Sequence, residues 1–213
     1  MITLLTDFGL TDQYVGVMKG VIATIAATVP VVDITHEVPA FSINQAAFLL
    51  DQSWRYFPKG TIHVAIVDPG VGSERRPLLI EAEGHYFIGP DNGLLSFALL
   101  TDKPKTRVLN EPKYWLPAPS STFHGRDIFA PVAAHLAAGV RPAKLGKLIA
   151  DPMRSTGLLP IRTSRRTYSG TVLHVDRFGN LITNFRITEF TTLRNRPFTF
   201  VAGMNEVELF SST

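Results

Sequence analysis

The chain has 213 residues, of which 45% are hydrophobic and 18% charged, and it contains no cysteine. This length and apolar content suffice for one large domain or two small ones and exclude a disordered chain. The lack of cysteine excludes disulfides, thiolate zinc sites, iron–sulfur clusters and thiol nucleophiles. The net charge of +3 arises after residue 150 and is too diffuse to indicate nucleic-acid binding.

The amino-terminal residues lack the basic leader and cleavage region of a signal peptide. The most apolar stretch, residues 15–32, is interrupted by Lys19 and Pro30, whereas a membrane span needs roughly 20 nearly uncharged residues. We therefore expect a cytoplasmic protein with no membrane partner.

The amino-terminal part alternates strand-like and helix-like segments. Residues 2–6 form an apolar run, residues 14–25 repeat apolar side chains at helical spacing, and residues 29–35 predict a second strand. Ser42 is expected to cap a helix that runs toward Trp54 and Phe57. This alternation predicts an α/β domain with a largely parallel central sheet flanked by helices.

The pattern continues with a buried strand over residues 61–67, which enters a glycine-rich loop. Residues 78–81 and 86–88 predict a hairpin, followed by a short helix through Leu100. Residues 128–138 predict a further helix, apolar on nearly all sides. We place the amino-terminal domain at residues 1–150.

Composition changes after this point. Pro152, Gly157 and Pro160 interrupt a segment without clear periodicity, so residues 151–166 are expected to be a linker. The remaining residues, 167–213, predict a smaller antiparallel β domain, with strand-like runs at residues 170–175, 181–185, 198–201 and 207–210.

Three polar clusters stand where predicted strands end, which is where open α/β sheets bind ligands. The first contains Asp7, which could hold a ribose diol or simply turn a loop. The second runs from Asp68 to Arg76 and could cradle a ligand with its glycines, or form a structural turn with an Asp–Arg ion pair. Its spacing fits neither the dinucleotide fingerprint nor the P-loop.

The third cluster, residues 122–127, precedes the apolar helix and contains His124, which could be functional or structural. Asp127 is expected to cap that helix, and Arg126 could pair with it. The other histidines lack the spacing of metal ligands, so we expect no metal.

Together these motifs resemble the S-adenosyl-L-methionine (SAM) hydrolases, or SAM hydroxide adenosyltransferases, which are related to the fluorinating and chlorinating enzymes. The resemblance covers essentially the whole chain in order and rests on residues 6–9, 16–20, 67–76, 89–95, 122–134 and 176–184.

The resemblance implies attack by water or hydroxide on ribose C5′ of SAM, releasing adenosine and L-methionine. Asp68, Arg75 and His124 would position the nucleophile. Because methionine leaves as a neutral thioether, no general acid is required. The halogenating relatives carry Tyr where Asp68 stands, and a carboxylate there would repel a halide.

The resemblance also implies the substrate contacts and the assembly. Asp7 would bind the ribose hydroxyls, Phe41 would form a wall of the adenosine pocket, and Phe123 and Gly125 would flank C5′. In the second domain, Asp176 would bind the methionine ammonium, while Phe178 and Asn180 would contact adenine. These halves would meet across the subunits of a homotrimer, with no cofactor beyond SAM as substrate.

Family members usually continue past Thr213 with further strands, so we expect an incomplete carboxyl-terminal domain. Two alternatives remain open: a SAM- or adenosine-binding protein with little turnover, and a nucleophilic halogenase that makes 5′-halo-5′-deoxyadenosine.

Overall fold

The computed structural model describes residues 1–157, 159–186, 190, 198–203 and 205–206. The chain divides into two compact units, Met1–Leu158 and Leu159–Thr213. Residues 151–157 belong to the first unit, where Met153 N–H donates to Asp91 Oδ1 at 2.7 Å and Ser155 N–H to Ser96 Oγ at 2.7 Å.

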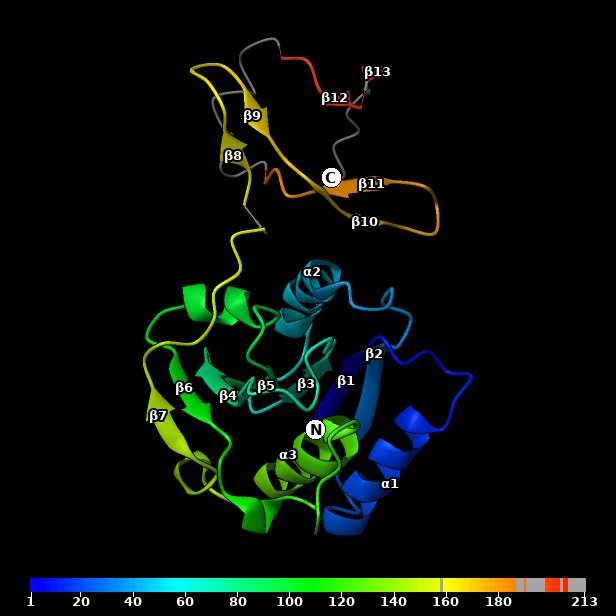
Figure 1. Ribbon diagram of the computed structural model, residues 1–213, viewed down its shortest axis with the longest axis vertical. Helices are drawn as coiled ribbons and strands as arrows, with labels where there is room; N and C mark the ends of the chain where they lie inside the picture. Colours follow the sequence, from blue (N-terminus) through cyan, green and yellow to red (C-terminus); the bar gives the residue numbers. More distant parts are fainter. Residues whose placement is uncertain (158, 187–189, 191–197, 204, 207–213) are drawn as a thin grey trace. The chain divides into compact units, whose positions relative to one another are not determined.

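The first unit is built on a seven-stranded sheet of order β2-β1-β3-β5-β4-β6-β7 (Figure 1). Strands β2, β1, β3 and β5 are parallel, and β4, β6 and β7 continue the sheet through antiparallel pairs. The strands are β1 Ile2–Thr6, β2 Val31–Thr35, β3 Ile62–Ile66, β4 Pro77–Ala82, β5 His85–Pro90, β6 Lys105–Val108 and β7 Lys147–Ile149.

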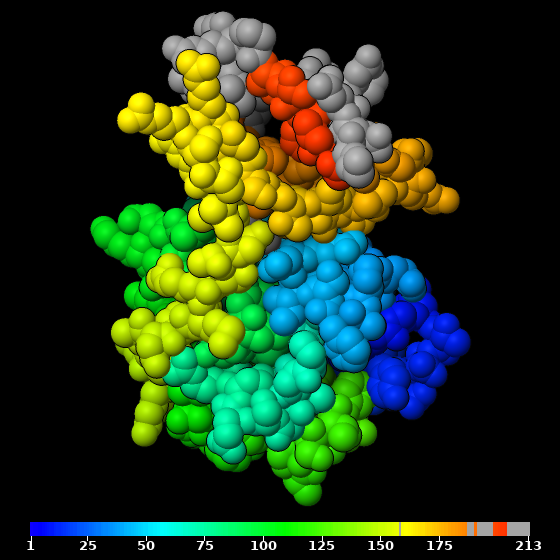
Figure 2. Space-filling model, turned by 45° about the horizontal axis from the view of Figure 1, so that its top comes forward, coloured from blue at the N-terminus to red at the C-terminus, as the bar shows by residue number. Residues whose placement is uncertain are grey.

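Helices cover both faces of this sheet: α1 and α3 lie on one face and α2 on the other (Figure 1). Helix α2 forms part of the surface of the first unit and is light blue in Figure 2. The helices are α1 Tyr14–Ile25, α2 Ile43–Ser53 and α3 Ala130–Ala137; short 3-10 turns are η1 Trp54–Tyr56, η2 Ser96–Leu100, η3 Pro112–Tyr114 and η5 Pro142–Lys144.

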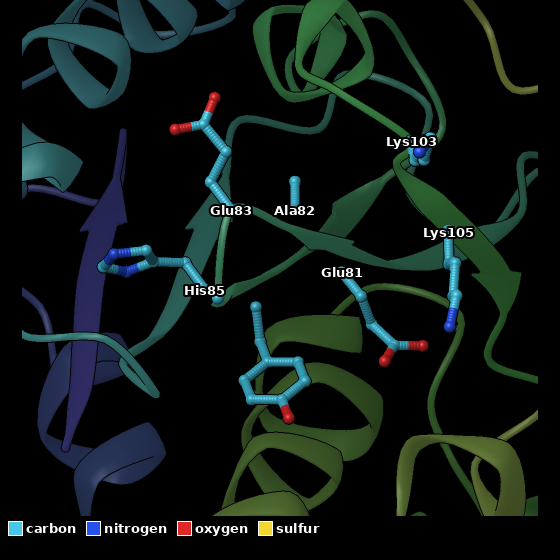
Figure 3. A pocket seen from close by; sticks show the side chains of 8 residues that line it. Glu81, Ala82, Glu83, His85, Lys103 and Lys105 are labelled. Carbon is cyan, nitrogen blue, oxygen red and sulfur yellow. The ribbon is translucent and has the colours of Figure 1, made fainter.

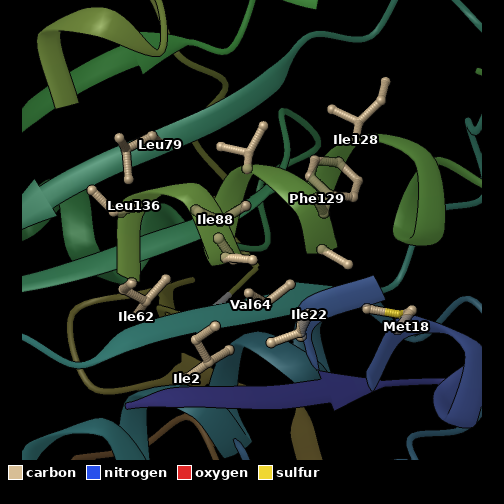
Figure 4. Packing of buried hydrophobic residues seen from close by; sticks show 14 of the residues in the cluster. Ile2, Met18, Ile22, Ile62, Val64, Leu79, Ile88, Ile128, Phe129 and Leu136 are labelled. Carbon is tan, nitrogen blue, oxygen red and sulfur yellow. The ribbon is translucent and has the colours of Figure 1, made fainter. Parts of the chain in front are cut away.

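Alternation along the central strands explains the two-sided core. In β3, Ile62 and Val64 pack toward α1 and α3 (Figure 4), as does Ile66, whereas Ala65 packs toward α2. Every residue of β1 and β3 is buried, because both faces of the parallel half are covered. Burying one such Ile side chain contributes roughly 1.5–3 kcal/mol. The predicted α/β class with a mostly parallel central sheet is confirmed.

Two helix starts differ from the sequence expectation. Ser42 occupies the N-cap position of α2, but its side chain makes no capping hydrogen bond. Asp127 does not cap α3, whose N-cap is Phe129; a π-helical turn, η4 Gly125–Phe129, contains Asp127 instead. Asp127 accepts hydrogen bonds from the Ser120 N–H and hydroxyl, and it pairs with Arg126 as one alternative held.

The second unit contains small antiparallel strand pairs, as expected for this part of the chain. They are β8 Ile161–Arg162 with β9 Tyr168–Ser169, β10 Val172–Val175 with β11 Leu181–Thr183, and β12 Val201–Ala202 with β13 Asn205–Glu206. The strand expected at residues 207–210 lies outside the described residues.

Candidate active site

Three side chains singled out from the sequence meet beyond the carboxyl end of β3. Asp68 follows that strand, Arg75 lies seven residues further along the loop, and His124 precedes the π-helical turn η4. Arg75 Nε donates to Asp68 Oδ1 at 3.0 Å, and Arg75 Nη2 contacts Asp68 Oδ2. Arg75 Nη2 also lies 2.7 Å from His124 Nδ1. One guanidinium therefore bridges a carboxylate and an imidazole.

Burial strengthens this bridge. The Asp68 side chain is 5% exposed and that of Arg75 is 8% exposed. A charged pair with so little solvent is held by its partners, because a lone buried charge would be costly. The guanidinium carbon also lies 5.4 Å from the centre of the Phe129 ring, a cation–π distance.

The protonation of His124 follows from this geometry. Burial lowers the pKa of His124, and the positive charge of Arg75 lowers it further, against the opposing effects of Asp68, Asp127 and a hydrogen bond to the Ser120 backbone. Arginine can only donate, so Nδ1 is the acceptor and Nε2 carries the proton of the neutral ring. At neutral pH, His124 therefore presents an N–H donor at Nε2.

Arg75 has a further donor. Its Nη1 is buried and has no hydrogen-bond partner among the described residues. A buried donor without a partner is a feature that a bound water, hydroxide or ligand would satisfy.

Gly72 shapes the loop that carries Asp68 and Arg75. Its φ is +79°, and a Cβ there would lie 2.2 Å from the Ser121 carbonyl oxygen. The loop can therefore approach residue 121, three positions before His124, only with glycine at this point. Val71 N–H donates to Asp68 O at 3.2 Å and Ser73 N–H to Gly70 O at 3.1 Å, which folds the loop on itself.

Gly125 lies next to a cluster of aromatic side chains. A Cβ there would stand 3.1 Å from the Phe123 ring and 3.2 Å from Met18 Sδ. Phe123 packs edge-on against Tyr14 and Phe8, with ring centres 5.1 and 5.9 Å away. Phe8 lies in the motif at residues 6–9 and Tyr14 begins the predicted helix, but neither was assigned a role at the site, because their contact with Phe123 arises from the fold.

Asp7 and Phe41 form a second contact at the same edge of the sheet. Asp7 follows β1, which is parallel to β3 with Thr6 opposite Ile66, so Asp7 and Asp68 leave neighbouring strand ends. Asp7 Oδ2 accepts the Phe41 N–H at 2.9 Å. Phe41 has a φ of +65° and is 68% exposed, a strained backbone that presents an aromatic ring to solvent.

In the second unit, Asp176, Phe178 and Asn180 share one turn between β10 and β11. Asp176 Oδ1 accepts the N–H groups of Phe178 and Asn180, each at 2.9 Å, and Oδ2 accepts Asn180 Nδ2 at 2.7 Å. The side-chain bond from Asn180 is the main reason that the pKa of Asp176 is lowered. The Phe178 ring is 85% exposed at the tip of this turn.

The opposite end of the first unit's sheet carries a shallow pocket beside the β4–β5 turn (Figure 3). It contains none of the residues described above, and its charges are mixed, with two carboxylates and two ammonium groups. The lining residues are Glu81, Ala82, Glu83, Gly84, His85, Tyr86, Lys103 and Lys105.

The described residues contain neither a metal-binding cluster nor a membrane-spanning helix. No three His, Cys, Asp or Glu side chains of the described chain come together in a way that could hold a metal ion. Within the same residues, no helix is long and apolar enough to cross a membrane.

Comparison with known proteins gives consistent matches. Residues 2–146 match the model of the SAM hydroxide adenosyltransferase N-terminal domain. The chain is 43% identical over 189 residues to an (R)-S-adenosyl-L-methionine hydrolase of Thermus thermophilus, covering 84% of this chain and 72% of that protein. It is 39% identical over 197 residues to a hydrolase of the same name from Methanocaldococcus jannaschii, covering 90% and 69%.

A fluorinase of an Actinoplanes strain is more distant, at 28% identity over 226 residues, covering 89% of this chain and 72% of that protein. Among solved structures, an uncharacterized conserved protein from Thermotoga maritima is similar with a TM-score of 0.88 and 36% identity, covering 97% of this chain and 81% of that chain.

Proposed function

Because the chain belongs to the SAM hydroxide adenosyltransferase family, we propose that it is an enzyme that hydrolyses S-adenosyl-L-methionine to adenosine and L-methionine. The observation that carries the proposal is the buried bridge from Asp68 through Arg75 to His124. These are the three side chains that the family resemblance assigns to the nucleophile, and they meet at one point.

The reaction balances without a cofactor. Water oxygen forms a bond to ribose C5′, and the C5′–S bond breaks with its electron pair passing to the sulfonium sulfur. Methionine leaves as a neutral thioether, adenosine gains the 5′-hydroxyl, and one water proton passes to solvent. Catalysis is then mainly the alignment and activation of one water, for which positioned groups can contribute strongly.

The bridge supplies groups for that alignment. Asp68 accepts a hydrogen bond from the water on a remaining lone pair, since a carboxylate has about four acceptor positions. The His124 Nε2–H and the unpartnered Arg75 Nη1 donate to the water oxygen, which stabilises hydroxide as the proton departs. The positive charge of Arg75 favours the same anion.

Substrate contacts come from both units in this proposal. Asp7 binds the ribose hydroxyls while it retains Phe41 N–H, Phe41 lines the adenosine pocket, and Phe123 with Gly125 flanks C5′. The second unit contributes Asp176 to the methionine ammonium and Phe178 with Asn180 to adenine. We further propose a metal-independent, cytoplasmic homotrimer with the site at the subunit interface, and domains at residues 1–150 and 167–213 joined by a linker.

A halide nucleophile is disfavoured by the same geometry. Asp68 places a buried carboxylate where the nucleophile enters, and like charges repel strongly in an environment poor in water. The lower sequence identity to the fluorinase, 28% against 43% to the hydrolase, agrees with a water nucleophile.

Incubation of the purified protein with SAM, followed by separation and identification of products, tests the proposal. We expect adenosine and methionine in equal amounts, unchanged by a chelator and with no 5′-halo-adenosine when chloride or fluoride is added. Adenosine binding without turnover would indicate a binding protein instead, and a halogenated product would indicate a halogenase.

A further inference from the structure

A second polar chain, buried at Thr6 and His36, lies beside the loop at residues 7–9, the Asp7 loop, and has no part in the mechanism above. It joins the carboxyl ends of two neighbouring parallel strands: Thr6 is the last residue of β1, Asp33 lies within β2, and His36 follows β2. Asp7 leaves β1 directly after Thr6, so this chain adjoins the residue proposed to bind ribose.

The contacts run from Lys19 at the surface to the backbone of the loop at residues 7–9. Lys19 Nζ pairs with Asp33 Oδ2 at 2.6 Å, and Asp33 Oδ1 lies 3.0 Å from His36 Nε2. His36 Nδ1 lies 2.8 Å from Thr6 Oγ1, which accepts the Phe8 N–H at 3.2 Å. Although burial alone would raise the pKa of Asp33, the contacts with Lys19 and His36 lower it, so Asp33 is ionised at neutral pH.

Thr6 and His36 are shielded from water, which makes their mutual contact important. Thr6 is 0% exposed and His36 is 3% exposed, so their polar atoms depend on one another for hydrogen bonds. The Asp33 carboxylate lies 3.0 Å from His36 Nε2 and the Thr6 hydroxyl lies 2.8 Å from His36 Nδ1, so each ring nitrogen faces one polar partner. The Thr6 oxygen is then oriented to accept the Phe8 N–H.

His36 also holds the loop through its backbone. Gly9 N–H donates to the His36 carbonyl at 2.8 Å, and Gly9 has a φ of +65°. The N–H groups of Phe8 and Gly9 are therefore both bound by this chain, directly after Asp7.

From this geometry we propose that Asp33, His36 and Thr6 form a positioning chain that holds the Asp7 loop in the shape that binds the ribose of the substrate. The inference rests on the proposed function, since it takes Asp7 as the ribose ligand. The chain touches none of the side chains that align the water, so it governs affinity for the nucleoside rather than the rate of C5′ attack.

The first unit offers a matched control. Thr3, also on β1 and 0% exposed, lies with its Oγ1 2.8 Å from Nδ1 of the buried His63. This pair has the same chemistry and burial as Thr6 with His36, but it lies at the other end of β1. A purely structural Thr–His pair would behave as Thr3 does.

The test compares Thr6→Val, Thr6→Ser and Thr3→Val in the full-length protein. Calorimetry gives the Kd for adenosine, hydrolysis assays give kcat and KM for SAM, and thermal unfolding gives Tm. Loss of the Thr6 hydroxyl should raise the adenosine Kd and KM by about tenfold, the size expected for one buried hydrogen bond, with a much smaller change in kcat. Thr6→Ser should recover the affinity, and Thr3→Val should lower Tm without changing Kd.

Asp33→Ala is the second variant, since its side chain is 35% exposed and its loss should leave the core intact. It should raise Kd in the same direction. Equal effects of Thr6→Val and Thr3→Val on Kd, or a fall in Tm with Kd unchanged, would overturn the inference, as would wild-type protein that binds no adenosine. Absence of SAM hydrolysis with these Kd differences intact would reject the proposed function and leave the inference standing.

Discussion

Histidines lie at both ends of the central sheet, but the partners of those histidines differ. At the carboxyl edge, His124 faces the Arg75 cation and His36 faces the Asp33 anion. Both charged partners lie beside loops that leave the carboxyl ends of the strands. Each of these two histidines therefore has a charged side chain as a direct partner.

At the amino edge, His63 has no such charge partner among its described contacts. It lies between Thr3 and His85, 2.8 and 3.2 Å away, and its ring packs against Phe87 and Phe57. Burial lowers the pKa of His63 to about 3, so it is a neutral core residue. His36 and His124 thus contact a charged side chain directly, whereas His63 contacts a hydroxyl, another imidazole and aromatic rings.

The largest effect is expected from Asp68→Asn, which keeps the shape of the side chain and removes the charge that orients the water. Turnover of SAM should fall on the order of 10²- to 10⁴-fold, the range of a positioned acid–base group. Glu81→Gln is the matched control, because Glu81 pairs with Arg107 at 3.2 Å in the antiparallel part of the sheet. Similar losses of kcat in both variants would show that the carboxyl end of the parallel strands has no special role in turnover.

Arg75→Lys should produce the next largest loss. Lysine keeps the positive charge but lacks the planar fork with which Arg75 contacts Asp68 and His124 together. We expect kcat to fall on the order of 10²-fold, measured alongside Tm to exclude unfolding. Full activity would show that charge alone, without the bridge, suffices.

Gly72→Ala should destabilise the loop that carries the bridge. The positive φ and the 2.2 Å approach to the Ser121 carbonyl leave no space for a methyl group, which should cost about 1–3 kcal/mol of unfolding free energy and lower kcat. Gly20→Ala in α1 is the control, since a Cβ there meets nothing within 4 Å, and it should be neutral or stabilising. Chemical denaturation measures both.

The smallest effect concerns pH and the amino edge. Unfolded His63 binds a proton below a pKa of 6.5, whereas folded His63 stays neutral until about pH 3. The unfolded state therefore binds more protons in this window, and stability should fall as pH decreases, by at most about 1.4 kcal/mol per pH unit from His63. Lowered pKa values of His85, His124 and His135 act in the same direction.

Measuring unfolding between pH 6.5 and 5 keeps most carboxylates ionised and isolates the histidines. His63→Gln should flatten this slope, whereas an unchanged slope would place the proton uptake elsewhere. His124→Gln should change the slope less, because its burial is smaller.

Local pattern was sufficient for the parallel half of the fold. The strand at residues 2–6 and the helix at residues 14–25 were predicted with the bounds that the structure has, because their apolar periodicity is strong. Strands β6 and β7 were missed, since they are short, partly exposed and held by pairs formed only in the sheet. The π-helical turn at Gly125 likewise has no sequence signature.

The site shows the same division. The Asp68–Arg75 pair was within reach of sequence reasoning because seven residues separate its members in one glycine-rich loop. The link from Arg75 to His124 spans 49 residues and that from Thr6 to His36 spans 30, so only the fold brings these side chains together. The contact of His36 with Thr6 could not be inferred from the spacing of the two residues.

Hydrolysis of SAM in water enriched in oxygen-18 tests the central claim most directly. Attack at C5′ places the label in the 5′-hydroxyl of adenosine and leaves methionine unlabelled, which mass spectrometry of the two products reads in one experiment. We expect labelled adenosine from the wild-type protein and much less of it from Asp68→Asn. Unlabelled adenosine, or label in methionine, would contradict it.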